Sequence, residues 1–151
     1  MAFRFRLEKV LQYRRRLLEE QTREVAAANR AVEAIDQRLA DLAEQVQQQL
    51  TTETAGPNPS LSVAHLMNRR QWLDHLERRR ETVRQERATA QDALAEARKK
   101  LNAAWRDLEV LEQLKKKQRQ AWAQRQEKRE QQALDEQGQI RAHRNDGEKV
   151  S

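Results

Sequence analysis

The ten residues TTETAGPNPS, at positions 51–60, decide the fold, because they separate two long series of heptad repeats. We call each series a ladder. Gly56, Pro57 and Pro59 all fall in this segment. Each proline removes a backbone donor and disfavours helix in the residue before it, so no continuous helix passes through. A short connection between two helices that both carry an apolar seam favours antiparallel neighbours. The chain is therefore predicted to turn back on itself here.

Each ladder has two rows that repeat every seven residues, on either side of the break. Before it the rows are Leu11, Leu18, Val25, Val32, Leu39 and Val46, with Arg14, Gln21, Ala28, Ile35, Leu42 and Gln49 three positions further on. After it they are Leu66, Leu73, Arg80, Arg87, Leu94, Leu101 and Leu108, with Leu76, Val83, Ala90, Ala97, Ala104 and Leu111. Two such positions in seven make a narrow stripe, which is typical of a supercoiled seam and too narrow to cover a globular core.

We therefore expect an all-α fold, a long antiparallel two-helix coiled coil (a helical hairpin) with an overhanging C-terminal helix. The whole chain, 1–151, is expected to form this single domain, monomeric or weakly associating. Its expected parts are helix 1 at about 5–50, a tip loop at 51–60, helix 2 at about 61–137 and a frayed tail at 138–151. If the two helix ends face each other across the tip, Leu11 lies near Lys100 and helix 2 lacks a facing segment from about Glu109.

The composition agrees with long helices and gives no sign of catalysis. Charged residues make up 36% of the chain and aromatic residues 4%. Disorder has a similar composition, but a disordered sequence has no reason to keep a heptad register. The chain has no glycine-rich phosphate loop, no metal-binding His-Glu-x-x-His helix and no cysteine. His65 and His75 lie too far apart along a helix to share a metal ion. We expect no enzyme, no catalytic residues, no cofactor and no metal.

No apolar run approaches the roughly 20 residues that span a bilayer, and the first residues lack the hydrophobic stretch of a signal peptide. A cytoplasmic protein without direct membrane insertion is the expectation.

The charges are uneven along the chain. Residues 1–16 carry six basic side chains and one acidic one, and residues 111–129 carry seven basic and two acidic, so each stretch has a net charge of +5. Both stretches fall at the open end of the predicted hairpin. Such a basic end suits either a nucleic acid or an acidic protein. Acidic residues interspersed among the basic clusters, such as Glu8 and Glu77, would repel phosphates, so the protein partner is preferred and a basic coiled-coil nucleic-acid-binding or scaffold protein is the alternative.

Three tryptophans are candidate contact residues. Trp105 is expected to close the open end of the hairpin against residues 3–7. Trp122 falls in the overhang with no facing segment, and because tryptophan often anchors interfaces it is expected to contact a partner. Trp72 lies on the shoulder of the seam, one turn before Leu76, where a structural role and an interface role are equally plausible.

Two stretches of the chain resemble the FliJ proteins of the flagellar type III export apparatus. They are FRFRLEKVLQYRRRLLEEQ, from Phe3, and LEQLKKKQRQAWAQRQEKREQQALDE, from Leu111. The length and the hairpin layout are also similar over the whole chain. The stalk proteins of injectisomes share this layout, so the two stretches are what favour the flagellar family.

The resemblance implies a non-enzymatic stalk at the cytoplasmic face of the inner membrane, at the flagellar base. In that family the terminal end enters and activates the hexameric export ATPase, and the protein also contacts the export gate protein FlhA and export chaperones. The ring contact would fall on the open end here, at Arg14, Arg15, Arg16, Lys115, Lys116, Lys117 and Trp122. The gate contact would fall on Trp72 and Leu76. Arg79 and Val83, the next positions of that face, depart from the small residue and the histidine of the family.

Overall fold

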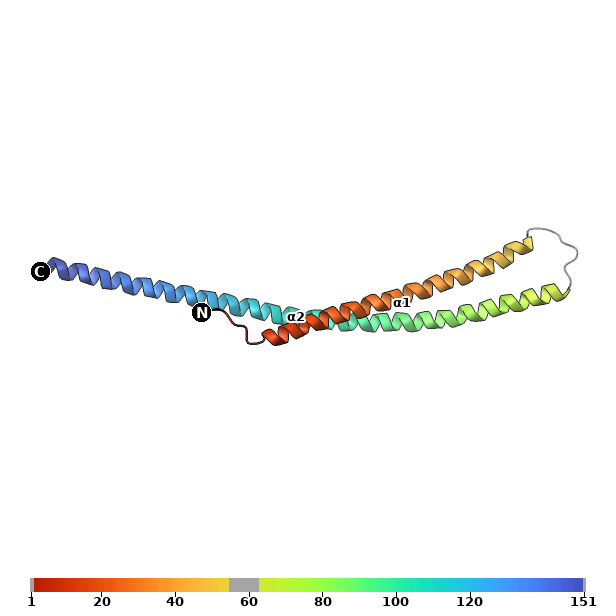
Figure 1. Cartoon of the computed structure of the whole chain (residues 1–151), viewed down its shortest axis with the longest axis horizontal. Coiled ribbons are helices and arrows are strands. Elements are labelled where there is room, and N and C mark those ends of the chain that lie inside the picture. The colour runs from red at the N-terminus through yellow and green to blue at the C-terminus, as the bar shows by residue number, and fades with distance from the viewer. Residues whose placement is uncertain (1, 55–62, 151) are drawn as a thin grey trace. The chain divides into compact units, whose positions relative to one another are not determined.

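The computed structural model describes residues 2–54 and 63–150. In these ranges the chain forms two helices, α1 (Glu8–Thr54) and α2 (Val63–Val150), and no strand (Figure 1). The all-α prediction is confirmed. Helix α1 extends four residues into the expected tip loop, and the remaining loop positions, 55–60, lie outside the described residues, as do positions 61 and 62 of the expected helix 2.

Helix α2 is longer than the sequence suggested. It was expected to end at Gln137 and to be followed by a frayed tail, but it continues without a break to Val150. Gly138 and Gly147 both lie within it. A glycine costs a helix about 1 kcal/mol relative to alanine. The predicted boundary at Gln137 was wrong because a single glycine weakens a helix of this length without ending it.

The chain divides into two compact units, each of which contains a stretch of both helices. The terminal unit comprises Met1–Arg16 and Trp105–Ser151, and the tip unit comprises Leu17–Ala104.

The tip unit has the apolar seam that the ladders predicted. Leu42, Leu76 and Val83 form its buried cluster. Ile35, Leu39 and Val46 are partly buried and pack against that cluster. In Figure 1 the orange and yellow part of α1 lies along the green part of α2 within this unit. The seam therefore joins apolar residues that are far apart in the sequence, as the heptad rows require.

Ion pairs across the tip unit show that the two helices run antiparallel. Arg38 pairs with Glu86 at 2.9 Å, and Asp36 pairs with Arg87. Further along α1, the carbonyl of Gln49 accepts a hydrogen bond from Arg69. As the position on α1 rises, the partner on α2 falls, which is the order of an antiparallel pair.

The terminal unit is also antiparallel, but its register differs from the predicted one. Glu8 pairs with Lys115 at 2.9 Å and Arg14 with Asp107 at 3.2 Å. Leu11, expected near Lys100, is fully buried between these two pairs along α1. The predicted register was displaced by roughly three turns of helix, because it matched the two helix ends. Burial of the seam instead requires ladder residues to face ladder residues.

Candidate interaction surfaces

Three of the predicted ring-contact cations are neutralised within the terminal unit. Arg14 and Arg15 pair with Asp107 and Glu112, at 3.2 and 3.4 Å. Lys115 pairs with Glu8 at 2.9 Å and is less exposed than Lys116 and Lys117. These three side chains thus contribute to the packing of α1 on α2. The sequence placed Lys115 beyond the reach of α1, and that placement was wrong.

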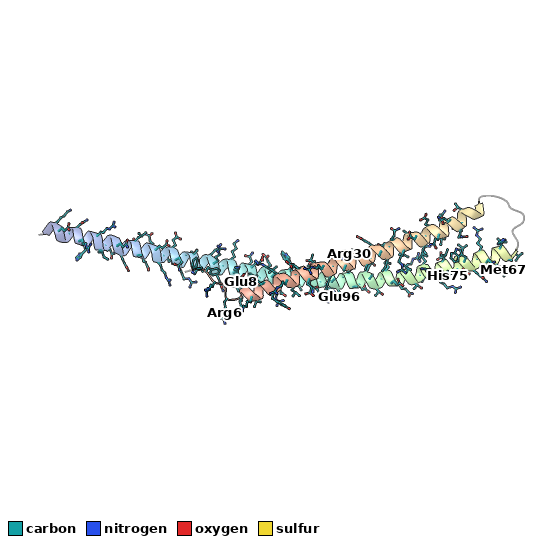
Figure 2. The ribbon with its side chains drawn as sticks, viewed as in Figure 1. Arg6, Glu8, Arg30, Met67, His75 and Glu96 are labelled. Carbon is teal, nitrogen blue, oxygen red and sulfur yellow. The ribbon has the colours of Figure 1, made fainter. Side chains whose placement is uncertain are left out.

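The other three predicted cations, Arg16, Lys116 and Lys117, are exposed. Across residues 2–54 and 63–150, no carboxylate lies within ion-pair distance of any of them. Arg4 and Arg6, just before α1, are exposed in the same way (Arg6 is labelled in Figure 2). The terminal unit therefore presents a group of cations whose charge is not compensated within the unit.

Trp122 does not lie in an unaccompanied part of α2, as the sequence suggested. Its ring lies 6.0 Å from that of Phe3, measured between centroids, with the two planes inclined by 50°. The non-helical segment before α1 thus extends along α2 beyond Lys115, and Phe5 in that segment is buried. The accompanied part of α2 reaches Trp122, well past the expected limit at Glu109. Half-buried Trp122 has an internal partner.

Trp105 does not close the open end. Its side chain is 56% exposed. The residues expected to cover it, Phe3 to Leu7, precede Glu8, which lies beside Lys115. The register displacement accounts for this difference as well.

Trp72 and Leu76, the predicted gate-contact residues, have different environments although they are one turn apart on α2. Trp72 is 46% exposed, and its ring lies 5.7 Å from the imidazole of His75 (His75 is labelled in Figure 2). Leu76 is only 2% exposed and belongs to the buried cluster with Leu42 and Val83. A partner that docks on this face reaches Trp72 directly, whereas Leu76 is held inside the seam.

Four further apolar side chains of the tip unit are exposed on α1 and α2, towards the ends of the two helices nearest the tip. They are Leu50, Val63, Leu66 and Met67. Of the predicted seam positions, Leu66 is the one whose side chain is largely exposed, so the seam becomes less well covered towards this end of the unit.

Within 2–54 and 63–150, no three His, Asp or Glu side chains gather in a set that could hold a metal ion. No helix in those ranges is both long enough and apolar enough to span a bilayer.

The model of the flagellar FliJ protein family matches residues 3–147, nearly the whole chain. No curated protein and no solved structure matches the chain.

Proposed function

This chain belongs to the FliJ family of flagellar proteins, and we propose that it is a stalk that activates the hexameric export ATPase and connects it to the export gate. Its membership makes it a component of the flagellar type III export apparatus and supports a non-catalytic role. The proposal adds the partners: the ATPase ring at the terminal unit, the gate protein FlhA at the tip unit, and export chaperones. It also places the stalk in the cytoplasm, peripheral to the inner membrane.

The observation that carries the ring contact is the uncompensated charge of the terminal unit. Arg16, Lys116 and Lys117 are exposed and have no carboxylate within ion-pair distance in the described chain. Opposite charges on two surfaces speed their encounter and disfavour wrong partners. An acidic lumen in the ATPase ring would complement this end of the molecule. Arg14, Arg15 and Lys115 support the contact indirectly, because they hold the two chain segments together.

The gate contact is supported by exposed apolar surface near the start of α2. Trp72 presents nearly half of its side chain to solvent. Tryptophan is enriched among the residues that dominate binding energy at interfaces. We propose that Trp72 makes the contact and that Leu76 fixes the position of α2 beneath it.

The ring contact is tested by reversing the exposed lysines. Lys116→Glu with Lys117→Glu should abolish stimulation of the ATPase without loss of helicity, since neither side chain packs in the seam. The matched control is Arg98→Glu with Lys100→Glu, which makes the same change of charge at exposed positions of the tip unit. Full stimulation by the first variant, or equal loss in both, would contradict the proposed contact. Steeply salt-dependent binding to DNA without any effect on the ATPase would favour the nucleic-acid alternative.

A further inference from the structure

One flank of the terminal unit is identified by an ion pair. Arg15 and Glu112 each directly follow a seam residue, and they pair across the two helices at 3.4 Å. In an antiparallel coiled coil, residues that follow the seam lie on one flank and residues that precede it lie on the other. Val10 precedes the buried Leu11, and Leu114 precedes Lys115, which lies seven positions after the seam residue Leu108 and continues its row. Val10 and Leu114 therefore lie together on the flank opposite the Arg15–Glu112 pair.

The register sets four apolar side chains on this second flank. The pairs Glu8–Lys115 and Arg14–Asp107 bracket the region. They place Val10 across from Leu114, and they place Tyr13, one turn along α1, across from Val110 on α2. We call this set, Val10, Tyr13, Val110 and Leu114, the apolar flank.

The apolar flank is open to solvent. Val10, Tyr13 and Val110 are 42%, 57% and 67% exposed, and Leu114 is partly buried. On α2 a groove of about 390 Å³ is lined by Glu109, Val110, Gln113, Leu114 and Lys117. Exposed apolar side chains that are contiguous over two helices, unlike isolated ones, mark an interaction surface.

The border of the apolar flank is basic. Four exposed cations, Lys9, Arg16, Arg106 and Lys117, lie within one turn of its residues. None of the four has an ion pair with any residue that the structure describes. The carboxylate of the groove, Glu109, accepts a hydrogen bond from Gln113 at 3.0 Å. The border thus has an excess of positive charge.

We propose that the apolar flank binds an amphipathic helix of a partner protein, one whose apolar stripe is bordered by acidic residues. A third helix laid against two antiparallel helices buries apolar side chains of both, and an amphipathic helix in such a groove is a recurring mode of recognition. The basic border selects acidic over basic helices. A second copy of this chain is a poor occupant, because it would bring the same basic border against the first. The border shares Arg16 and Lys117 with the proposed ring contact, whereas the apolar side chains of the flank take no part in that contact.

The probe is a fluorescent synthetic helical peptide of about three heptads, with leucine along one stripe and glutamate on both borders. A second peptide has lysine in place of each glutamate. Fluorescence anisotropy of the whole protein with each peptide measures the two affinities. The variant Tyr13→Ser with Val110→Ser removes apolar surface and leaves the seam intact. The matched control is Trp105→Ser, an equally exposed apolar residue that directly follows Ala104 and so lies on the other flank.

We expect the glutamate peptide to bind, and the double variant to weaken its binding at least about tenfold, as loss of central apolar contacts does. The control should bind like the unaltered protein, and the lysine peptide should bind more weakly. A photo-crosslinking residue at Gln113 should capture the peptide. Equal binding by the double variant, or a preference for the lysine peptide, would overturn the proposal. So would a dimer in sedimentation analysis that the double variant abolishes, because it would make a second copy the occupant.

Discussion

Phe3 and Trp122 join the N-terminal segment to α2, with ring centroids 6.0 Å apart and ring planes inclined by 50°. Inclined rings at this separation have the geometry that aromatic pairs prefer. Helix α1 begins only at Glu8, so this contact extends the paired part of the terminal unit beyond the first helical residue. This contact with Phe3 indicates that Trp122 helps to stabilise the terminal unit itself.

The first prediction is that the contact between Phe3 and Trp122 contributes to the free energy of unfolding. Phe3→Ala and Trp122→Ala should each lower the free energy of unfolding, and the double variant should lose less than the sum by about 1 kcal/mol, the typical coupling of an aromatic pair. Urea unfolding of the four proteins measures the coupling. Trp105→Ala is the control and should be nearly neutral, because its side chain is more than half exposed. Strictly additive losses would show that the two rings do not interact in solution.

The second prediction separates Lys115 from Lys117, two positions apart on α2. Lys115→Glu sets a carboxylate beside Glu8 and should lower the free energy of unfolding by about 1 kcal/mol, since the lost pair is partly exposed. High salt should reduce that loss by screening the repulsion. Lys117→Glu should leave stability unchanged at either salt concentration. Equal losses for the two variants would contradict the pairing of Lys115 with Glu8.

The third prediction concerns the register of the tip unit, which the Arg38–Glu86 pair helps to fix. A slip of one heptad would set Arg38 against Arg79 in one direction and against Ala93 in the other, so an attractive contact becomes repulsive or is lost. Arg38→Glu and Glu86→Arg should each destabilise the protein. The exchange of both charges should recover about 0.5 kcal/mol of that loss, as expected for an exposed pair.

Urea unfolding measures this recovery, and the control is the exchange Arg84→Glu with Glu81→Arg, which lies within α2 and does not depend on register. A register like the one predicted from the helix ends would give no recovery for Arg38 with Glu86.

The heptad rows predicted most of the seam, because burial in a two-helix coiled coil follows a period of 3.5, and Leu66 is the exception. Leu11, Leu42, Leu76 and Val83 are all buried as expected. Register was not predictable from the loop. The sequence did contain relevant information, since the ion pairs of the observed register, Arg38 with Glu86 and Glu8 with Lys115, join opposite charges.

The position of Trp122 could also have been read from the ladder. Lys115 and Trp122 continue at seven-residue steps the row whose last predicted position is Leu108. The burial of Phe5 and the contact of Phe3 had no such signal, because the segment before Glu8 is not helical and follows no period. The contact joins residues over a hundred positions apart in the chain, which local patterns do not report.

The last prediction distinguishes Trp72 from Leu76. The sequence predicted the same role, contact with the gate protein, for both residues. Trp72→Ala should leave the free energy of unfolding within about 0.5 kcal/mol of the original, since substitutions at exposed sites rarely do more, but should weaken binding to FlhA. Leu76→Ala should lower that free energy by about 2–5 kcal/mol, because it leaves a cavity among Leu42 and Val83. Binding titrations and urea unfolding of both variants, with Leu94→Ala as a buried control elsewhere in the seam, separate the two effects. If Leu76→Met, which keeps the seam filled, abolishes gate binding while Trp72→Ala does not, then Leu76 contacts the partner and the seam must open there when the gate protein binds.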